Sequence, residues 1–296
     1  MIAKKFFAMV FLFFLLFLSI NGKPYGGISS VITVDDEGDG DFTSIQEAVN
    51  HAKDGDIILV YSGVYNESVL IKNKSITIEG IAREIGKGND TGKPIISSTG
   101  KAIEIYSDNC SIENFTIKGE IDIFGDYNEI LNCEIIDCNL GIYINHGKGN
   151  RLDYNIISKA QYGGIVIHFS PFTTIRHNII RDSGGGIAVW DYSKKTEIIE
   201  NNIINCNYGI AIGGAPSTCV VVKHNNLINN SRQAEFENAY LCLWYENYWS
   251  DWNIPLPRPI FGTIGGVIMW WIFGIVIPWI QFDWHPLMQP YEWWKE

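Results

Sequence analysis

The chain has 296 residues and a mass of 33.4 kDa, enough for one large domain or two ordinary ones. Hydrophobic residues make up 46% and charged residues 19% of the sequence, which excludes a disordered protein and predicts a sizeable core. The formal net charge is −11, and this acidic balance predicts that nucleic acid is not a partner.

The first residues have the pattern of an export signal. Lys4 and Lys5 precede an uncharged apolar run from Phe6 to Ile20. Lysines followed by such a run are typical of a secretory signal peptide. Residues 1–22 are therefore predicted to be a signal peptide, with an uncleaved N-terminal anchor as the alternative. We expect an exported protein that is extracellular, periplasmic or held at the cell surface.

Ahead of the middle of the chain, one short helix is expected over residues 43–53. Thr43-Ser44-Ile45-Gln46 has the form of a capping box, and Ile45, Ala48, Val49 and Ala52 fall on one face at helical spacing. A helix with one apolar stripe would cover the open first coil of a solenoid, because exposed strand edges invite aggregation.

The middle of the chain is a repeat. Gly-Ile recurs at positions 141, 164, 186 and 209, and Asn followed by Ile or Leu recurs in step at positions 155, 178, 202 and 226. Short apolar alternations between Asn, Gly, Ser and Asp indicate short strands and tight bends. We predict an all-β fold over residues 31–252, a single-stranded right-handed parallel β-helix of roughly eight coils. The repeated Asn residues are expected at bends, in left-handed backbone, bonded to one another along the stack.

Two stretches resemble known families. Residues 33–71, TVDDEGDGDFTSIQEAVNHAKDGDIILVYSGVYNESVLI, look like the N-terminal cap and first coil of pectin-lyase-like right-handed β-helices. The repeats, together with NYWSDW at 247–252 and FDWHPL at 282–287, resemble NosD-type β-helix repeat proteins with a CASH-type domain. The resemblance implies the fold, whereas the superfamily mixes lyases, hydrolases, esterases and non-enzymatic surface proteins. NosD itself assists the assembly of a copper site in an exported reductase.

One outer wall of the solenoid is a candidate binding surface. Alternate residues of a strand point outward, so the repeat register places Asn145, His168, Trp190 and Gly213 in one column. The next column would hold His146, Phe169, Asp191 and Gly214. Aromatic rings beside His, Asn and Asp suit a sugar chain, which needs ring stacking and directional hydrogen bonds. The predicted substrate-binding residues are Tyr143, Asn145, His146, His168, Trp190 and Asp191. The alternative is a coincidental column of exposed side chains.

Candidate catalytic residues are three carboxylates, Asp137, Asp182 and Asp191. Asp137 and Asp182 occupy equivalent positions two coils apart, a separation close to that of the acids of inverting glycosidases. Both also precede bends, where Asp is common for local reasons. The signatures of pectin methylesterases, polygalacturonases and pectate lyases are incomplete or missing, so a non-enzymatic protein is favoured over a polysaccharide lyase or hydrolase.

No metal site or cofactor is assigned from the sequence. The acidic run Asp35, Asp36, Glu37, Asp39 and Asp41 is interpreted as a solvated turn, with calcium binding as the alternative. An outward column of Asp153, Arg176, Glu200 and His224 is interpreted as a charge ladder, with metal ligation as the alternative. Cys138 and Cys206 lie three coils apart, which is too far for a disulfide, whereas Cys219 and Cys242 could pair.

The tail, residues 253–296, is apolar and rich in tryptophan. Residues 260–280 contain no charge, but several glycines and Pro278 oppose a single membrane helix. The alternatives are a membrane-associated span or hairpin, and a cap on the last coil or a contact with a partner. Taken together, the sequence favours an exported scaffold that binds a polysaccharide or cell-envelope glycan. The alternatives are a lyase or hydrolase, and a NosD-like accessory protein for a metalloenzyme.

Overall fold

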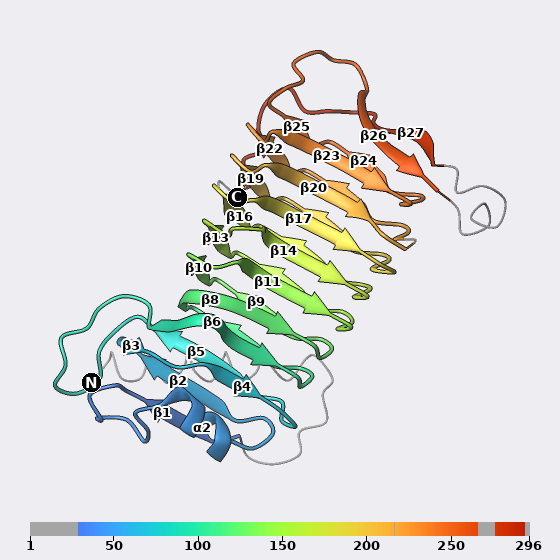
Figure 1. Cartoon of the computed structure of the whole chain (residues 1–296). Coiled ribbons are helices and arrows are strands. Elements are labelled where there is room, and N and C mark those ends of the chain that lie inside the picture. The colour runs from blue at the N-terminus through green and yellow to red at the C-terminus, as the bar shows by residue number, and fades with distance from the viewer. Residues whose placement is uncertain (1–28, 216, 266–275, 294–296) are drawn as a thin grey trace, which may run out of the picture.

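The computed structural model describes residues 29–215, 217–265 and 276–293. The predicted signal peptide or anchor, residues 1–22, lies outside these ranges. The chain forms a parallel β-solenoid of about ten turns with one short helix, as the repeat predicts (Figure 1). The expectation of roughly eight coils was too low, because the coils before residue 129 lack the Gly-Ile marker.

Three columns of parallel strands form the faces of the solenoid, and the strands of one face stack coil upon coil. Strands β6 and β8 turn a corner and belong to both face B and face C. Face A consists of β1 (Val31–Val34), β2 (Ile57–Tyr61), β5 (Thr77–Ile81), β7 (Ser111–Glu113), β9 (Glu129–Leu131), β12 (Arg151–Asp153), β15 (Thr174–Arg176), β18 (Glu197–Ile199), β21 (Val221–Lys223), β24 (Leu243–Tyr245) and β27 (Ile277–Asp283). Face B consists of β3 (Val64–Tyr65), β6 (Ile95–Ile105), β8 (Thr116–Ile123), β10 (Glu134–Ile136), β13 (Ile156–Ser158), β16 (Ile179–Arg181), β19 (Asn202–Ile204), β22 (Asn226–Ile228) and β25 (Tyr248–Trp249). Face C adds β4 (Val69–Ile71), β11 (Leu140–Asn145), β14 (Gly163–His168), β17 (Gly185–Trp190), β20 (Tyr208–Gly213), β23 (Arg232–Glu237) and β26 (Arg258–Ile264).

The core is a set of aliphatic rows, because the inward residue of each strand stacks on its equivalent in the next coil. One row on face A runs Ile112, Ile130, Leu152, Ile175, Ile198, Val222 and Trp244, all buried. At the C-terminal end, Trp244 and Trp249 replace the aliphatic residues, and their ring centroids lie 6.1 Å apart. Both tryptophans are fully buried, and their large side chains fill the last coil.

A buried row of asparagines runs along the bend after face A. The Oδ1 atoms of Asn178, Asn201 and Asn225 each accept the backbone N–H of the row member in the preceding coil, at 2.9–3.0 Å. The predicted bonding along the stack is therefore present. In the later coils, however, its members are Asn201 and Asn225 rather than Asn202 and Asn226.

The left-handed backbone belongs to the residue before each asparagine of this row, and not to the asparagine itself. Tyr154, His177, Glu200, His224 and Glu246 have φ between 53° and 59°. The expectation of left-handed asparagines was wrong at this bend, because the side-chain amide bonds to the neighbouring coil from ordinary backbone. Large side chains are thereby brought into one outward column at the bend.

The predicted cap helix is α2 (Ile45–His51), and it buries Ile45, Ala48 and Val49. Ser44 is the N-cap residue and accepts a hydrogen bond from the Glu47 N–H at 3.3 Å. The remaining N-terminal N–H groups of the helix are satisfied from another coil, because the Glu67 carboxylate accepts the N–H groups of Ile45 and Gln46. The cap is thus tied to the turn between β3 and β4, a contact that a local capping box does not predict.

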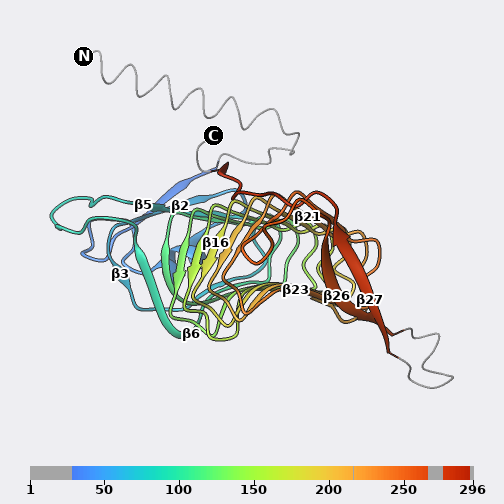
Figure 2. The same cartoon turned by 90° about the horizontal axis from the view of Figure 1, so that it is seen from above.

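The described ends of the apolar segment 260–280 are strands. β26 and β27 pair antiparallel from Arg258↔Asp283 to Ile264↔Ile277, and the pair projects away from the stack of coils (Figure 2). Phe261, Ile277, Trp279 and Ile280 are exposed on it. Among residues 29–215, 217–265 and 276–293, no helix is long and apolar enough to cross a membrane. Membrane association, and the treatment of 253–296 as a separate cap, stay predictions.

Candidate functional site

The first predicted column of the outer wall is present on face C. Asn145, His168, Trp190 and Gly213 are direct register partners from coil to coil. The Trp190 ring lies over Gly213, where an added Cβ would come within 2.4 Å of it. A larger residue at Gly213 would therefore displace the indole.

Tyr143 stands in the neighbouring column, where the following coils carry Val166, Ala188 and Ala211. These side chains are smaller than Tyr143, so the column presents less bulk in the later coils. The Tyr143 ring meets the His168 ring edge-on at 5.8 Å between centroids.

The second predicted column departs from expectation after Phe169. His146 stacks on Phe169 at 4.7 Å, and Phe169 stacks on Tyr192 at 6.2 Å, rather than facing Asp191. The reason is a one-residue shift: the His146 N–H bonds to the carbonyl of His168, whereas the Phe169 N–H bonds to that of Asp191. The Asp191 carboxylate instead lies 3.1 Å from His168 Nδ1. The structure thus brings the six predicted binding residues onto one wall, with Tyr192 added.

The three candidate acids do not form a cluster. Asp137 and Asp182 occupy equivalent left-handed bends before face C, with φ of 52° and 53°. Asp137 pairs with Lys159 at 3.7 Å, and Asp182 accepts a hydrogen bond from Asn205 at 3.2 Å. Asp191 follows the other end of the face C strands, so a catalytic role for this set stays a prediction.

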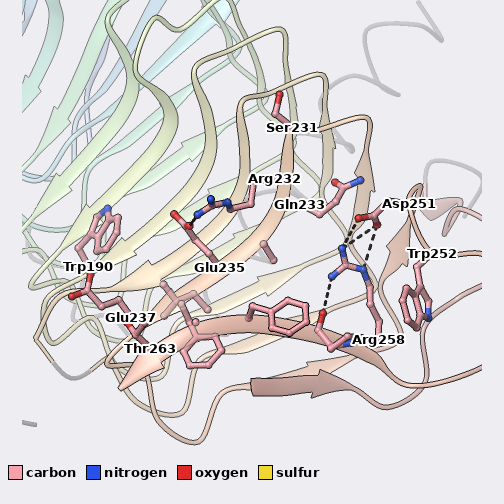
Figure 3. A pocket seen from close by; sticks show the side chains of 16 residues that line it. Trp190, Ser231, Arg232, Gln233, Glu235, Glu237, Asp251, Trp252, Arg258 and Thr263 are labelled. Atoms are coloured by element: carbon pink, nitrogen blue, oxygen red, sulfur yellow. Dashed lines mark hydrogen bonds and ion pairs between the residues drawn. The ribbon is translucent and has the colours of Figure 1, made fainter. Parts of the chain in front are cut away.

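A groove of about 820 Å³ lies where face C meets the projecting strand β26 (Figure 3). Its aromatic side chains are Trp190, Phe236, Trp252 and Phe261. The groove therefore begins at the end of the predicted wall, and Trp190 belongs to both.

Two internal ion pairs hold the charged side chains of the groove. Arg232 pairs with Glu235 on the strand β23. Arg258 Nη2 lies 2.7 Å from Asp251 Oδ2, and its guanidinium stands 4.0 Å above the Trp249 ring. With Glu237, the groove carries two positive and three negative side chains, a net charge of −1.

Arg232, Glu235 and Arg258 were not predicted from the sequence as site residues. The fifth unit replaces Gly-Ile by Gln233-Ala234, which hides the repeat, although Ala234 is the register partner of Ile210. Extending the period by one more unit would have placed Glu235 outward on the same wall. Arg258 carried no comparable signal, because it lies beyond the repeats.

On the N-terminal side of the same wall, the column of Tyr143 continues to the buried Asp122. Burial raises the pKa of the Asp122 carboxyl, which the ion pair with Lys101 at 2.8 Å opposes. Burial, followed by the charge of Asp122, also raises the pKa of Tyr143. This end of the wall is consequently polar and charged.

A second cluster lies at the bend after face A. The left-handed residues His177, Glu200, His224 and Glu246 form an alternating ladder that starts at Asp153. His177 Nδ1 is 2.8 Å from Asp153 and its Nε2 is 2.8 Å from Glu200, whereas His224 lies 3.7 Å from Glu200 and 2.7 Å from Glu246. The predicted charge ladder therefore exists with a different membership.

The membership differs because Arg176 is the register partner of Ile199, one residue before Glu200. Arg176 still lies 3.3 Å from Asp153. His177, which the sequence reasoning did not consider, takes the place of Arg176 in the ladder. The tail covers it, since Tyr291 stacks on His224 at 4.4 Å and Trp293 packs near His177 at 5.3 Å.

The residues that could ligate a metal differ between the two ends of the solenoid. In the described part of the chain, groups of three or more potential ligands within 4.8 Å of one another contain carboxylates alone, at the N-terminal end. His177, Glu200 and His224 come nearest to a set with imidazole, but they do not converge on one point. The described residues thus do not provide a preformed copper site.

All six cysteines are free thiols, including Cys219 and Cys242, for which a disulfide was an alternative. Cys138 and Cys206 are buried, in agreement with their interpretation as small core residues.

Comparisons with known proteins give a family and a fold. The sequence model of the family described as "Periplasmic copper-binding protein (NosD)" matches residues 49–255, more than half of the chain. A solved GH136 lacto-N-biosidase from Eubacterium ramulus is similar with a TM-score of 0.57 and 15% identity, over 74% of this chain and 56% of that one. A complex of XylC with xylose is similar with a TM-score of 0.46 and 13% identity, over 71% and 68%. The chain spans little more than half the length of the lacto-N-biosidase, and at 15% identity the likeness to that structure is one of fold. No curated protein matched.

Proposed function

The chain belongs to the NosD family of periplasmic copper-binding proteins, and from this premise we propose that it is an exported scaffold that binds a saccharide chain along face C. The observation that carries the proposal is the groove at β26, which continues the predicted wall. Four aromatic side chains line it, and two ion pairs fix the orientation of the charged groups beside them.

The shape of the wall suits an extended ligand. Along the column that begins at Tyr143, the side chains become small at Ala188 and Ala211, which lie beside Trp190 and Gly213 of the neighbouring column. Sugar rings present apolar faces to aromatic side chains and hydroxyl groups to His, Asn and carboxylates. A net groove charge of −1 favours an uncharged sugar over an acidic uronide.

Glycan binding tests the proposal. The full chain would be applied to an array of neutral and acidic glycans, followed by calorimetry with the best ligand. Replacing both Trp190 and Trp252 by Ala is expected to weaken binding at least about tenfold, which corresponds to about 1.4 kcal/mol.

The matched control is Trp284→Ala, because Trp284 is an exposed tryptophan of the C-terminal tail that does not line the groove. Retention of affinity in the double variant, or equal loss in the control, would refute the location of the site. Absence of binding to any glycan would refute the proposal itself.

A second candidate is copper binding, which the family and the histidine–carboxylate ladder favour. Imidazole is a good ligand for copper, and His177 and His224 share Glu200 as neighbour. Copper titration of the chain would be compared with a His177→Ala, His224→Ala variant and with a His146→Ala, His168→Ala variant. Stoichiometric binding lost in the first variant alone would assign it to the ladder, and loss in the second alone to the wall.

A further inference from the structure

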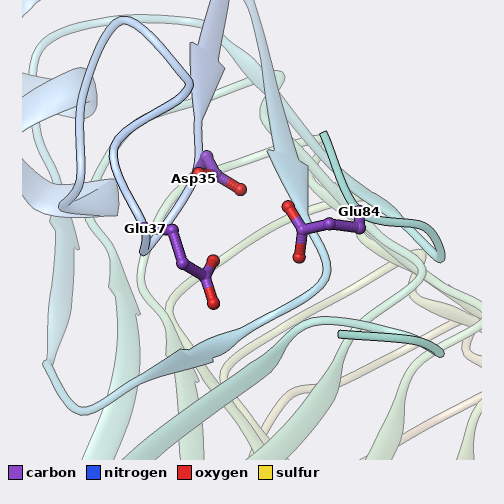
Figure 4. A group of neighbouring side chains, drawn as sticks. All are labelled: Asp35, Glu37 and Glu84. Carbon is purple, nitrogen blue, oxygen red and sulfur yellow. The ribbon is translucent and has the colours of Figure 1, made fainter. Parts of the chain in front are cut away.

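The turn after β1 and the loop between β5 and β6 bring together carboxylates from two distant parts of the sequence. Asp35, Glu37 and Glu84 each offer an oxygen within 4.8 Å of the others, and Figure 4 shows the three side chains facing one another. Asp36, Glu37 and Asp90 form a second such group that shares Glu37. Five carboxylates therefore meet at the N-terminal end of the solenoid.

Three buried oxygen atoms of these carboxylates have no hydrogen-bond partner within the protein. Asp35 is fully buried, yet its Oδ1 has no hydrogen-bond partner. Asp36 Oδ1 and Glu84 Oε2 are buried and also lack partners. Buried polar atoms without partners destabilise a fold, so three in one cluster indicate that something else binds them.

The second oxygens of the same carboxylates are already fixed by the backbone. Asp35 Oδ2 accepts the Asp39 N–H at 3.0 Å, and Asp36 Oδ2 accepts the Val64 N–H at 2.9 Å. Glu84 Oε1 accepts the Ile85 N–H at 2.7 Å. These bonds orient each carboxylate, which leaves its other oxygen free for a ligand.

The charge of the cluster is not balanced by basic side chains. In the described ranges, no Lys, Arg or His forms an ion pair with any of the five acids. The hydrogen-bonding contact between the Glu37 and Asp36 carboxyls is the largest cause, and desolvation and the charges of Asp36 and Glu84 add to it, so that the pKa of Glu37 is raised to about 7. Crowded like charges of this kind repel one another.

Glycines allow the backbone to close around the carboxylates. A Cβ at Gly63 would lie 2.1 Å from Asp36 Oδ1, and a Cβ at Gly88 would lie 2.5 Å from Glu84. Any side chain at these positions would push the acids out of place. Such close packing of backbone against the carboxylates is typical of an ordered binding site, whereas the carboxylates of a solvated turn point into water.

We propose that Asp35, Glu37 and Glu84 bind one Ca²⁺ ion, with Asp36 and Asp90 adding negative charge beside it. An all-oxygen carboxylate set of this kind suits Ca²⁺, whereas copper prefers imidazole or sulfur ligands. The ion joins the turn at 35–41 to the loop at 82–94, and so fixes the first coils beneath α2. The site is separate from the groove on face C.

Calorimetric titration with CaCl₂ after treatment with EDTA tests the proposal on the full chain. The expected result is one ion per chain with a Kd between about 10 μM and 1 mM. The variants Glu37→Gln and Glu84→Gln are expected to weaken binding at least about tenfold, because each removes a charged ligand. The matched control is Glu47→Gln, which removes an exposed carboxylate from the nearby helix.

Limited trypsin digestion supplies a second measurement. Ca²⁺ is expected to slow cleavage after Arg83 and Lys87 in the wild type and in Glu47→Gln, but not in Glu37→Gln. The last comparison controls for any effect of Ca²⁺ on the protease. Absence of binding heat and of protection in the wild type would overturn the proposal, as would unchanged affinity in both ligand variants.

Discussion

At the scale of single residues, the asparagine row shows how one side chain serves two coils. Asn201 Nδ2 donates to the carbonyls of Ile175 and Ile199, and its Oδ1 accepts the N–H of Asn178. Backbone groups at a buried bend have no strand partner, so the amide replaces the missing ladder. The requirement for both a donor and an acceptor explains why the row uses Asn.

Replacing Asn201 by Ala is therefore expected to be strongly destabilising. The change leaves buried backbone groups unpaired in two coils, and the free energy of unfolding should fall by about 3 kcal/mol. Urea denaturation followed by circular dichroism would measure it. The control Asn139→Ala alters an exposed asparagine of the repeats and should change stability by less than about 0.5 kcal/mol. Similar losses in both variants would contradict this account.

The sequence was informative about residues where the repeat is regular, and less so at bends. The column Asn145, His168 and Trp190 follows from strand alternation alone. The positions of Asp191 and His177 depend on single-residue shifts between coils, which change no apolar pattern. The carboxylates of Glu84 and Asp90 come from an irregular loop, so only the folded chain places them beside Glu37.

At the scale of elements, the β26–β27 hairpin differs from every other strand pair described, because it is antiparallel and projects from the stack. Four consecutive residues of β27, from Ile277 to Ile280, are exposed. An apolar surface of this kind is a typical interaction site in soluble proteins and at membrane interfaces. The apolar segment was recognised in the sequence. Its glycines and β-branched residues are compatible with strands as well as with a helix, so the sequence did not decide between a helix and a hairpin.

The hairpin predicts binding to a lipid surface. The double variant Trp279→Ser, Ile280→Ser should reduce partition of the full chain onto neutral phosphatidylcholine vesicles at least about tenfold, because it removes two apolar contacts. Neutral lipid avoids repulsion of a chain with a net charge of −11.

Sedimentation with vesicles would measure the partition. The control variant Tyr162→Ser, Leu243→Ser removes two exposed apolar side chains outside the hairpin. If the wild type does not sediment with vesicles, or if both variants behave alike, the hairpin is not a lipid anchor.

At the scale of the whole molecule, the period of the repeat fixed the architecture but not the number of coils. On face A the register partners from Glu129 onward are 22–24 residues apart through Leu243. Before them, the separations are 26, 20, 34 and 18 residues. Coils of unequal length can still stack, since only the strands must align, and this is why the sequence underestimated their number.

A solenoid has contacts only between neighbouring coils, so its ends should open before its middle. The reactivity of the cysteines can be used to measure the order in which the coils open. Burial raises the pKa of Cys133 to about 12 and that of Cys242 to about 11. Cys133 is buried and Cys242 is partly buried in the native state, whereas Cys219 is exposed. The raised pKa values keep the thiols of Cys133 and Cys242 largely protonated, and therefore unreactive, at pH 8.

Iodoacetamide at pH 8 should therefore alkylate Cys219 first in the native protein. As urea is increased, Cys242 in the last coil should react before Cys133, which has coils on both sides. Peptide mass spectrometry would give the order. Simultaneous reaction of Cys133 and Cys242 would indicate that the solenoid unfolds as one unit, and protection of Cys219 until reductant is added would indicate a disulfide.

The asparagine row ends in a residue from the distant tail. Asp283 Oδ2 accepts hydrogen bonds from the N–H and the side-chain amide of Asn247 and from the indole of Trp249, at 3.0–3.1 Å. An asparagine passes the pattern on, because it donates as well as accepts, but a carboxylate only accepts. Asp283 therefore acts as the chain terminator of a growing polymer does. It accepts the last hydrogen bonds of the row and has no N–H to donate, so a second molecule cannot extend the row of side-chain amides at this end.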